Sequence, residues 1–135
     1  KTMGDNCYYL LDAGFNNLAR PILYGSYHPM AICPIQQPDL SRPTHEVVVG
    51  GPLCESGDIF TQEEGGFVSR RILPEARIGD YLVIGCAGAY GAVMGSNYNS
   101  KPLAPEVLIE NGTPHLIRTR QTFDDLVRGE QIPRD

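Results

Sequence analysis

A cysteine and a glutamate stand side by side in a glycine-flanked turn, residues 51–58, directly after a β-branched apolar run. Such a turn presents the Cys54 thiol instead of packing it, and the carboxylates of Glu55 and Asp58 nearby disfavour the thiolate. A thiol that stays protonated near neutral pH suits a proton donor better than a nucleophile. The alternative is structural: Cys54 fills space at the end of a strand, while Ser56 and Asp58 make turn hydrogen bonds.

Two further segments carry side chains suited to a polar substrate. Arg20 precedes Tyr24 by four residues, so a guanidinium fork and a phenol are available for one carboxylate. Small residues dominate residues 85–99, where Tyr90 and Tyr98 can offer hydroxyls to a phosphate or another polar group. The glycine spacing there does not fit the dinucleotide-binding motif. The structural alternatives are an exposed arginine with half-buried tyrosines, and a glycine-rich bend.

Composition excludes several classes of protein. The chain has 135 residues, with 11 Lys and Arg against 16 Asp and Glu, and a formal net charge of −5. This acidic balance argues against nucleic-acid binding, and no apolar run is long enough to span a bilayer. The four cysteines form no C-x-x-C pair, so we expect no structural zinc site. Their even number permits two disulfides, but because no secretion signal is visible we expect free thiols in a reducing cytoplasm. Lys1 and Lys101 are the only lysines, and with Lys1 in first place we expect a piece of a longer protein.

Short strands separated by glycine- and proline-containing turns are expected along the chain. They cover residues 7–13, 47–49, 67–73 and 81–86, followed by a hairpin over 107–118. Residues 15–30 are predicted to form turns and short extended pieces, and residues 34–43 an exposed connection. One helix is expected over residues 122–127, because Thr122 and the aspartate three positions later suit an N-terminal cap. These patterns predict one mainly β domain over residues 1–135, a β-sandwich or Greek-key barrel with one short C-terminal helix.

The motif segments, taken together, are similar to one family. They are residues 12–18, 20–28, 51–58, 88–91, 96–100 and 105–108. In this order they resemble the C-terminal region of the diaminopimelate decarboxylases, which are fold-type III pyridoxal-phosphate enzymes. The pieces Cys-Glu-Ser-Gly-Asp at 54–58 and Ser-Asn-Tyr-Asn at 96–99 carry most of the specificity.

The resemblance implies a longer enzyme whose N-terminal (β/α)₈ barrel is absent from this chain. That barrel would bind pyridoxal 5′-phosphate through a Schiff-base lysine, and the active sites would lie at the interface of a homodimer. By the family's pattern, Cys54 is the proton donor and Glu55 binds the substrate amino group. Arg20 and Tyr24 bind the distal end of the substrate, and Tyr90 meets both substrate and cofactor. Without the lysine, the 135 residues alone are expected to be inactive.

The implied reaction converts meso-2,6-diaminopimelate to L-lysine and CO₂. The pyridine ring absorbs the electrons released with CO₂, and Cys54 returns a proton to the α-carbon. Arg20 favours a diamino diacid over ornithine, because ornithine lacks the distal carboxylate. Two alternatives stay open: a related fold-type III decarboxylase acting on ornithine, arginine or carboxynorspermidine, and a non-catalytic β-sandwich that binds ligands or proteins.

Overall fold

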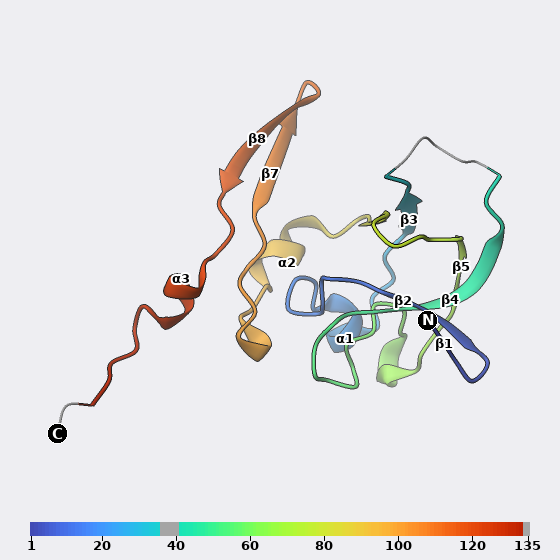
Figure 1. Ribbon diagram of the computed structural model, residues 1–135, viewed down its shortest axis with the longest axis horizontal. Helices are drawn as coiled ribbons and strands as arrows, with labels where there is room; N and C mark the ends of the chain where they lie inside the picture. The colour runs from blue at the N-terminus through green and yellow to red at the C-terminus, as the bar shows by residue number, and fades with distance from the viewer. Residues whose placement is uncertain (36–40, 134–135) are drawn as a thin grey trace. The chain divides into compact units, whose positions relative to one another are not determined.

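In the computed structural model, which describes residues 1–35 and 41–133, the chain folds as two units, Lys1–Gly95 and Ser96–Asp135 (Figure 1). The first unit contains β1 (Thr2–Met3), β2 (Asn6–Leu10), α1 (Arg20–Tyr24), β3 (Met30–Cys33), β4 (Thr44–Gly50), the 3-10 turn η1 (Glu64–Gly66), β5 (Arg71–Pro74), β6 (Tyr81–Ile84) and α2 (Gly88–Val93). The second contains η2 (Tyr98–Ser100), β7 (Glu106–Glu110), β8 (Thr113–Arg118) and α3 (Phe123–Val127).

Three consecutive valines place β4 at the centre of the first unit. Val47, Val48 and Val49 are at most 1% exposed, and β-branched side chains pack well in a buried strand. β4 runs parallel to β2 and antiparallel to β5, in a sheet of order β1-β2-β4-β5. β3 and β6 form a separate antiparallel pair whose apolar side chains pack against the same core. The core cluster comprises Leu18, Val47, Val49, Phe60 and Leu73. The mainly β expectation is confirmed.

Two short helices occupy segments that the sequence patterns assign to turns. α1 begins at Arg20, and Pro21 fits its first turn because that position needs no N–H donor. α2 forms despite its glycines, because Gly91 is buried with the core residue Leu18 beside it. A Cβ at position 91 would lie 3.1 Å from the Ala87 Cβ. Tertiary packing therefore outweighs the poor helix propensity of glycine.

Several predicted strands differ from the observed ones at their ends. β2 stops at Leu10, three residues before the expected end, and β5 contains only the last part of the predicted 67–73 strand. β3 was not expected at all, because its four residues follow a run of turn-forming residues. The predicted connection 34–43 lies partly outside the described residues, which omit 36–40.

The second unit contains the hairpin and the helix that the sequence predicts. Asn111 and Gly112 both have positive φ, 51° and 79°, as a tight two-residue hairpin turn requires. Thr122 and Asp125 form a reciprocal capping box at the start of α3. Hydrogen bonds from the Thr122 backbone and hydroxyl hold the pKa of the Asp125 carboxyl below its usual range.

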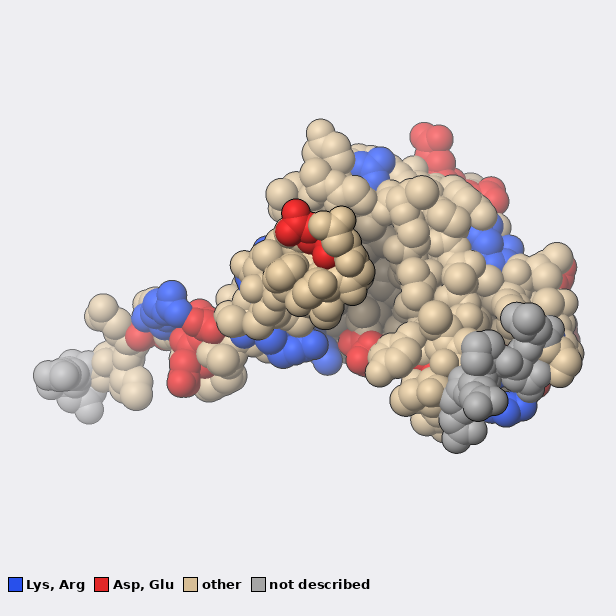
Figure 2. All heavy atoms as spheres, turned by 90° about the horizontal axis from the view of Figure 1, so that it is seen from above, with Lys and Arg blue, Asp and Glu red and all other residues tan. Residues whose placement is uncertain are grey.

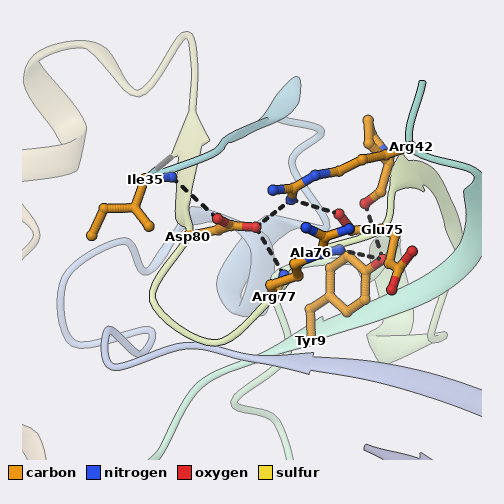
Figure 3. Close-up of polar contacts among 8 residues, drawn as sticks. Tyr9, Ile35, Arg42, Glu75, Ala76, Arg77 and Asp80 are labelled. Atoms are coloured by element: carbon orange, nitrogen blue, oxygen red, sulfur yellow. Dashed lines mark hydrogen bonds and ion pairs between the residues drawn. The ribbon is translucent and has the colours of Figure 1, made fainter. Parts of the chain in front are cut away.

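A cluster of polar side chains joins the start of β4 to the loop between β5 and β6 (Figure 3). The Asp80 carboxylate forms an ion pair with Arg42 and accepts hydrogen bonds from the backbone N–H groups of Arg77 (2.8 Å) and Ile35 (3.2 Å). These contacts, that of Arg42 first, lower the pKa of Asp80 to about 2. In the same loop region the Tyr9 hydroxyl donates to the carbonyl of Pro74, the last residue of β5. Burial raises the pKa of Tyr9.

The Asp80 contacts should stabilise the fold only while that carboxyl is ionised. A depressed pKa in the folded state contributes stability above the unfolded value of about 4 and loses it as pH falls toward about 2. We therefore expect Asp80→Asn to lower the urea midpoint at pH 6, and the gap from the unsubstituted protein to narrow between pH 4 and 2. Urea titrations of both proteins at a series of pH values measure this gap. A gap that stays constant down to pH 2 would show that the ion pair does not contribute.

Charged side chains show no single-sign concentration on the face drawn in Figure 2. Lys and Arg are scattered there among Asp, Glu and uncharged residues on each unit. Within residues 1–35 and 41–133, no helix has both the length and the apolar composition needed to cross a membrane.

Candidate functional site

The turn that carries Cys54 leaves the end of β4 and returns to the core within eight residues. Its flanks are anchored, because Leu53 is 8% exposed and Asp58 is 4% exposed. Cys54, Glu55 and Ser56 between them are exposed. The thiol is therefore presented at the surface of this chain, as the functional interpretation of the sequence requires, and it does not fill space in the core.

Backbone hydrogen bonds close this turn. The N–H of Gly51 donates to the carbonyl of Asp58 at 2.9 Å, and the N–H of Asp58 donates to the carbonyl of Glu55 at 3.1 Å. The Glu55 carboxylate accepts from the Ser56 hydroxyl at 3.2 Å and from the Gly57 N–H at 3.3 Å. These bonds give Cys54 and Glu55 a defined place on a turn outside the sheet.

Helix α1 presents Arg20 and Tyr24 on one face, because residues four apart are neighbours on a helix. The Arg20 guanidinium carbon lies 5.6 Å from the ring centroid of Tyr24 and 5.6 Å from that of Tyr90, on α2. An Arg20 Nη donates to the Ser26 hydroxyl at 3.4 Å. The two exposed phenols thus hold the guanidinium between them through cation–π attraction. The structure brings Tyr90, proposed from a separate segment, to the pair of Arg20 and Tyr24 that the sequence analysis proposed together.

The C-terminus of α1 depends on a glycine. Gly25 has φ 59°, and its N–H donates to the Pro21 carbonyl at 2.9 Å. A Cβ at this position would lie 2.0 Å from the backbone nitrogen of Glu64 in η1. Position 25 therefore requires glycine for two reasons: its backbone is left-handed, and η1 approaches it closely.

We expect Gly25→Ala to lower the free energy of unfolding by more than Gly4→Ala. Both glycines have positive φ, 59° and 56°, which costs a residue with a Cβ about 1–2 kcal/mol. Only Gly25 adds a backbone clash, because nothing lies within 4 Å of a Cβ at Gly4. Chemical denaturation of both variants measures the difference. Equal losses would mean that η1 moves away at no cost.

The Cys54 turn and α1 pack against each other. A Cβ on Gly57 would meet the Ile22 Cδ1 at 2.6 Å, so the turn approaches the helix closely there. A groove of about 520 Å³ lies along this contact. Its lining comes from α1, from the turn, and from η1 with the residues on both sides of it, and includes Ile22, Leu23, Glu55, Ser56, Gln62 and Val68. Glu55 therefore borders the same groove as α1, and Cys54 lies next to Glu55 on the same turn.

The sequence analysis missed two parts of this arrangement. Ser26, which binds Arg20, lies beyond the end of an unpredicted helix, and no spacing rule points to it. Asp58 was interpreted as a charge beside the thiol or, in the structural alternative, as a source of turn hydrogen bonds. Its carboxylate does accept from the Leu53 N–H within the turn, but its bond from the Phe15 N–H was not foreseen. Tyr98, a further candidate hydroxyl, lies in the second unit.

The residues present fit one side of a binding site for an anionic cofactor or substrate. The Arg20 guanidinium and the phenols of Tyr24 and Tyr90 suit a carboxylate or a phosphate. Neither Lys1 nor Lys101 takes part in the contacts of Arg20 with Tyr24, Tyr90 and Ser26. Among the described residues no group of three or more His, Cys, Asp or Glu is arranged to hold a metal ion, and all four cysteines are unpaired.

Comparison with known proteins shows the family of this chain. A family model described as pyridoxal-dependent decarboxylase, C-terminal sheet domain, matches residues 1–88. The chain belongs to this family. Diaminopimelate decarboxylase of Escherichia coli strain K12 is 57% identical over 133 residues, which cover 98% of this chain and 32% of that protein.

Solved structures of the family agree with the sheet domain described above. A crystal structure of diaminopimelate decarboxylase superposes with a TM-score of 0.91 at 56% identity, over 95% of this chain and 31% of that chain. Diaminopimelate decarboxylase from M. jannaschii, in co-complex with L-lysine, superposes with a TM-score of 0.83 at 32% identity, over 98% of this chain and 28% of that chain. The chain thus spans about a third of the length of the relatives it matches.

Proposed function

We propose that this chain is the C-terminal domain of a pyridoxal 5′-phosphate-dependent diaminopimelate decarboxylase, which converts meso-2,6-diaminopimelate to L-lysine and CO₂. The observation that carries the proposal is the Arg20 guanidinium held between Tyr24 and Tyr90. The identity to diaminopimelate decarboxylases over nearly the whole chain supports the same reaction. The co-complex of the M. jannaschii relative with L-lysine fits L-lysine as the product.

Arg20 and Tyr24 bind the carboxylate at the distal end of the substrate. A guanidinium fork accommodates both carboxylate oxygens, and the adjacent phenol adds a third donor. Ser26 and the two aromatic rings hold the guanidinium in place before the substrate arrives. This preorganisation selects a diamino diacid over ornithine, arginine or carboxynorspermidine, because only the diacid offers a distal carboxylate to pair with the guanidinium once substrate covers it.

Glu55 and Tyr90 bind the remaining polar groups. The Glu55 carboxylate, exposed on the turn, attracts the substrate amino group at the distal end. The Tyr90 hydroxyl contacts both substrate and cofactor, and its phenol is exposed beside Arg20. The bound cofactor supplies an electron sink for the pair left behind by CO₂.

Cys54 delivers the proton that replaces CO₂. Its S–H bond breaks, the proton goes to the α-carbon, and the thiolate left behind takes a proton from solvent to restore the acid. Its exposed place on the turn makes the thiol accessible to a substrate bound elsewhere in the assembly. A positioned acid of this kind contributes about 10²–10⁴-fold to a rate.

The assembly completes the site. The proposed full chain has its own N-terminal barrel, which carries the Schiff-base lysine, and works in the cytoplasm as a homodimer. In that dimer Cys54 and Glu55 reach the active site of the partner subunit. This arrangement is consistent with the exposure of the Cys54 thiol in the single chain.

Release of CO₂ from meso-2,6-diaminopimelate tests the proposal. The full-length protein with pyridoxal 5′-phosphate should release CO₂, and the 135-residue chain with the same cofactor should release none, because the lysine is missing. A full-length protein that folds, binds the cofactor and releases no CO₂ would favour a non-catalytic binding domain. Release by the 135 residues alone would contradict the division of labour between the domains.

A further inference from the structure

We propose that Asp58 is a positioning residue that ties the Cys54 turn to the segment entering α1, and that Gln62 braces the same turn from its other end. The inference rests on the proposed function, because it concerns the placement of Cys54 and Arg20 for that reaction. The hydrogen bonds from which it is argued are observed in the structure and do not depend on which reaction the protein catalyses.

The two oxygens of the Asp58 carboxylate bind two different segments. Oδ1 accepts from the N–H of Phe15 at 2.7 Å, and Oδ2 accepts from the N–H of Leu53 at 2.8 Å. Leu53 directly precedes Cys54, and Phe15 stands five residues before Arg20. One buried side chain, 4% exposed, therefore fixes the entry to both functional segments.

Two glycines make room for this carboxylate. A Cβ on Gly51 would lie 2.2 Å from the Asp58 Oδ2, and a Cβ on Gly14 would lie 2.9 Å from the same atom. Neither glycine has a positive φ, so the backbone conformation does not require glycine at either position. The need is spatial: both segments approach the carboxylate closely enough to place their N–H groups on it.

Gln62 holds the C-terminal side of the same turn. Its side-chain nitrogen donates to the carbonyl of Gly57 at 3.0 Å and to that of Ile59 at 2.7 Å, on either side of Asp58. Gln62 is 4% exposed. The turn is therefore fixed by side chains at both ends, while Cys54 and Glu55 between them stay exposed.

These contacts indicate a positioning role and not a chemical one. Both Asp58 oxygens are engaged by backbone N–H groups and the side chain is buried, so it neither binds substrate nor exchanges a proton with it. Displacement of an acid by about 1 Å can cost on the order of 10² in rate. Loss of the tie should release the Cys54 turn and the entry to α1 together.

Asp58→Asn in the full-length protein tests the tie. The substitution keeps the size of the side chain but replaces one carboxylate oxygen with an NH₂ group. That group cannot accept a hydrogen bond, so one of the two backbone N–H groups loses its acceptor. We expect kcat for CO₂ release to fall about 10²-fold and KM to rise, because the Arg20 segment also loosens. A mere loss of folded protein would lower the apparent kcat and leave KM unchanged. Amide hydrogen exchange at Phe15 and Leu53 should accelerate.

Asp80→Asn is the matched control. Asp80 is a second carboxylate, with a side chain 4% exposed, that accepts from two backbone N–H groups, in a cluster without Cys54 or α1 (Figure 3). Assayed below its melting temperature, this variant should keep the kcat, the KM and the exchange at Phe15 and Leu53. If Asp58→Asn matches the control in these quantities, the proposal is overturned.

A second variant covers the case in which Asp58→Asn does not fold. Gln62→Met keeps the volume and removes both hydrogen bonds, so kcat should fall by a smaller factor than for Asp58→Asn, with faster exchange across the turn. Unchanged kcat and exchange in this variant would then overturn the proposal. If the full-length protein binds the cofactor but releases no CO₂ from diaminopimelate, the proposed function fails instead, and the exchange at Phe15 and Leu53 still decides whether Asp58 ties the two segments.

Discussion

Cys54→Ala should lower kcat for CO₂ release by the full-length protein by about 10²–10⁴-fold, the usual contribution of a positioned acid. The methyl group cannot give up a proton, so protonation of the α-carbon must wait for solvent. KM should change little, because Arg20, Tyr24 and Glu55 are left in place. Steady-state kinetics with diaminopimelate measures both quantities.

A second exposed cysteine provides the control. Cys33 ends β3 and, like Cys54, is exposed and unpaired, but the proposal gives it no role. Cys33→Ala should keep the kcat of the unsubstituted protein. Near-normal turnover of Cys54→Ala, or an equal loss in Cys33→Ala, would rule out Cys54 as the donor.

Arg20→Ala should lower kcat/KM for diaminopimelate by roughly 10²-fold or more, mainly through KM, which corresponds to the loss of a desolvated charge pair. Activity toward ornithine, which has no distal carboxylate, should change far less. The ratio of kcat/KM for diaminopimelate to that for ornithine should therefore fall. Arg20→Lys should recover only part of the loss, because an ammonium does not match both carboxylate oxygens.

Another arginine–tyrosine pair serves as the matched control for Arg20. The Arg71 guanidinium carbon lies 4.4 Å from the ring centroid of Tyr27, outside the proposed substrate contacts. Arg71→Ala removes a comparable cation–π contact and should keep the KM for diaminopimelate. An unchanged KM in Arg20→Ala would count against the carboxylate clamp.

Local patterns were enough to predict the parts of the fold that local chemistry determines. The valines of β4, the Asn111–Gly112 turn and the Thr122–Asp125 capping box each depend on neighbouring residues, and each was found. Helix α1 was missed, because its five residues carry a proline and are too few to show a helical period. Its form depends on the close approach of η1 to Gly25, which no local pattern shows.

The candidate site shows the same limit. The residue types of Cys54, Arg20 and Tyr90 indicated their chemistry, but the stacking of Arg20 on Tyr90 joins segments far apart in the chain. The bond from Phe15 to Asp58 spans 43 residues. Contacts of this kind follow from packing of the whole unit, so the sequence indicated which side chains to examine without showing what holds them in place.

The ratio of kcat/KM for meso-2,6-diaminopimelate to that for ornithine, measured with the full-length protein and pyridoxal 5′-phosphate, tests the central claim most directly. The Arg20 clamp predicts strong preference for diaminopimelate, because only that substrate offers a distal carboxylate. Equal use of the two substrates, or a preference for ornithine, would contradict the assignment.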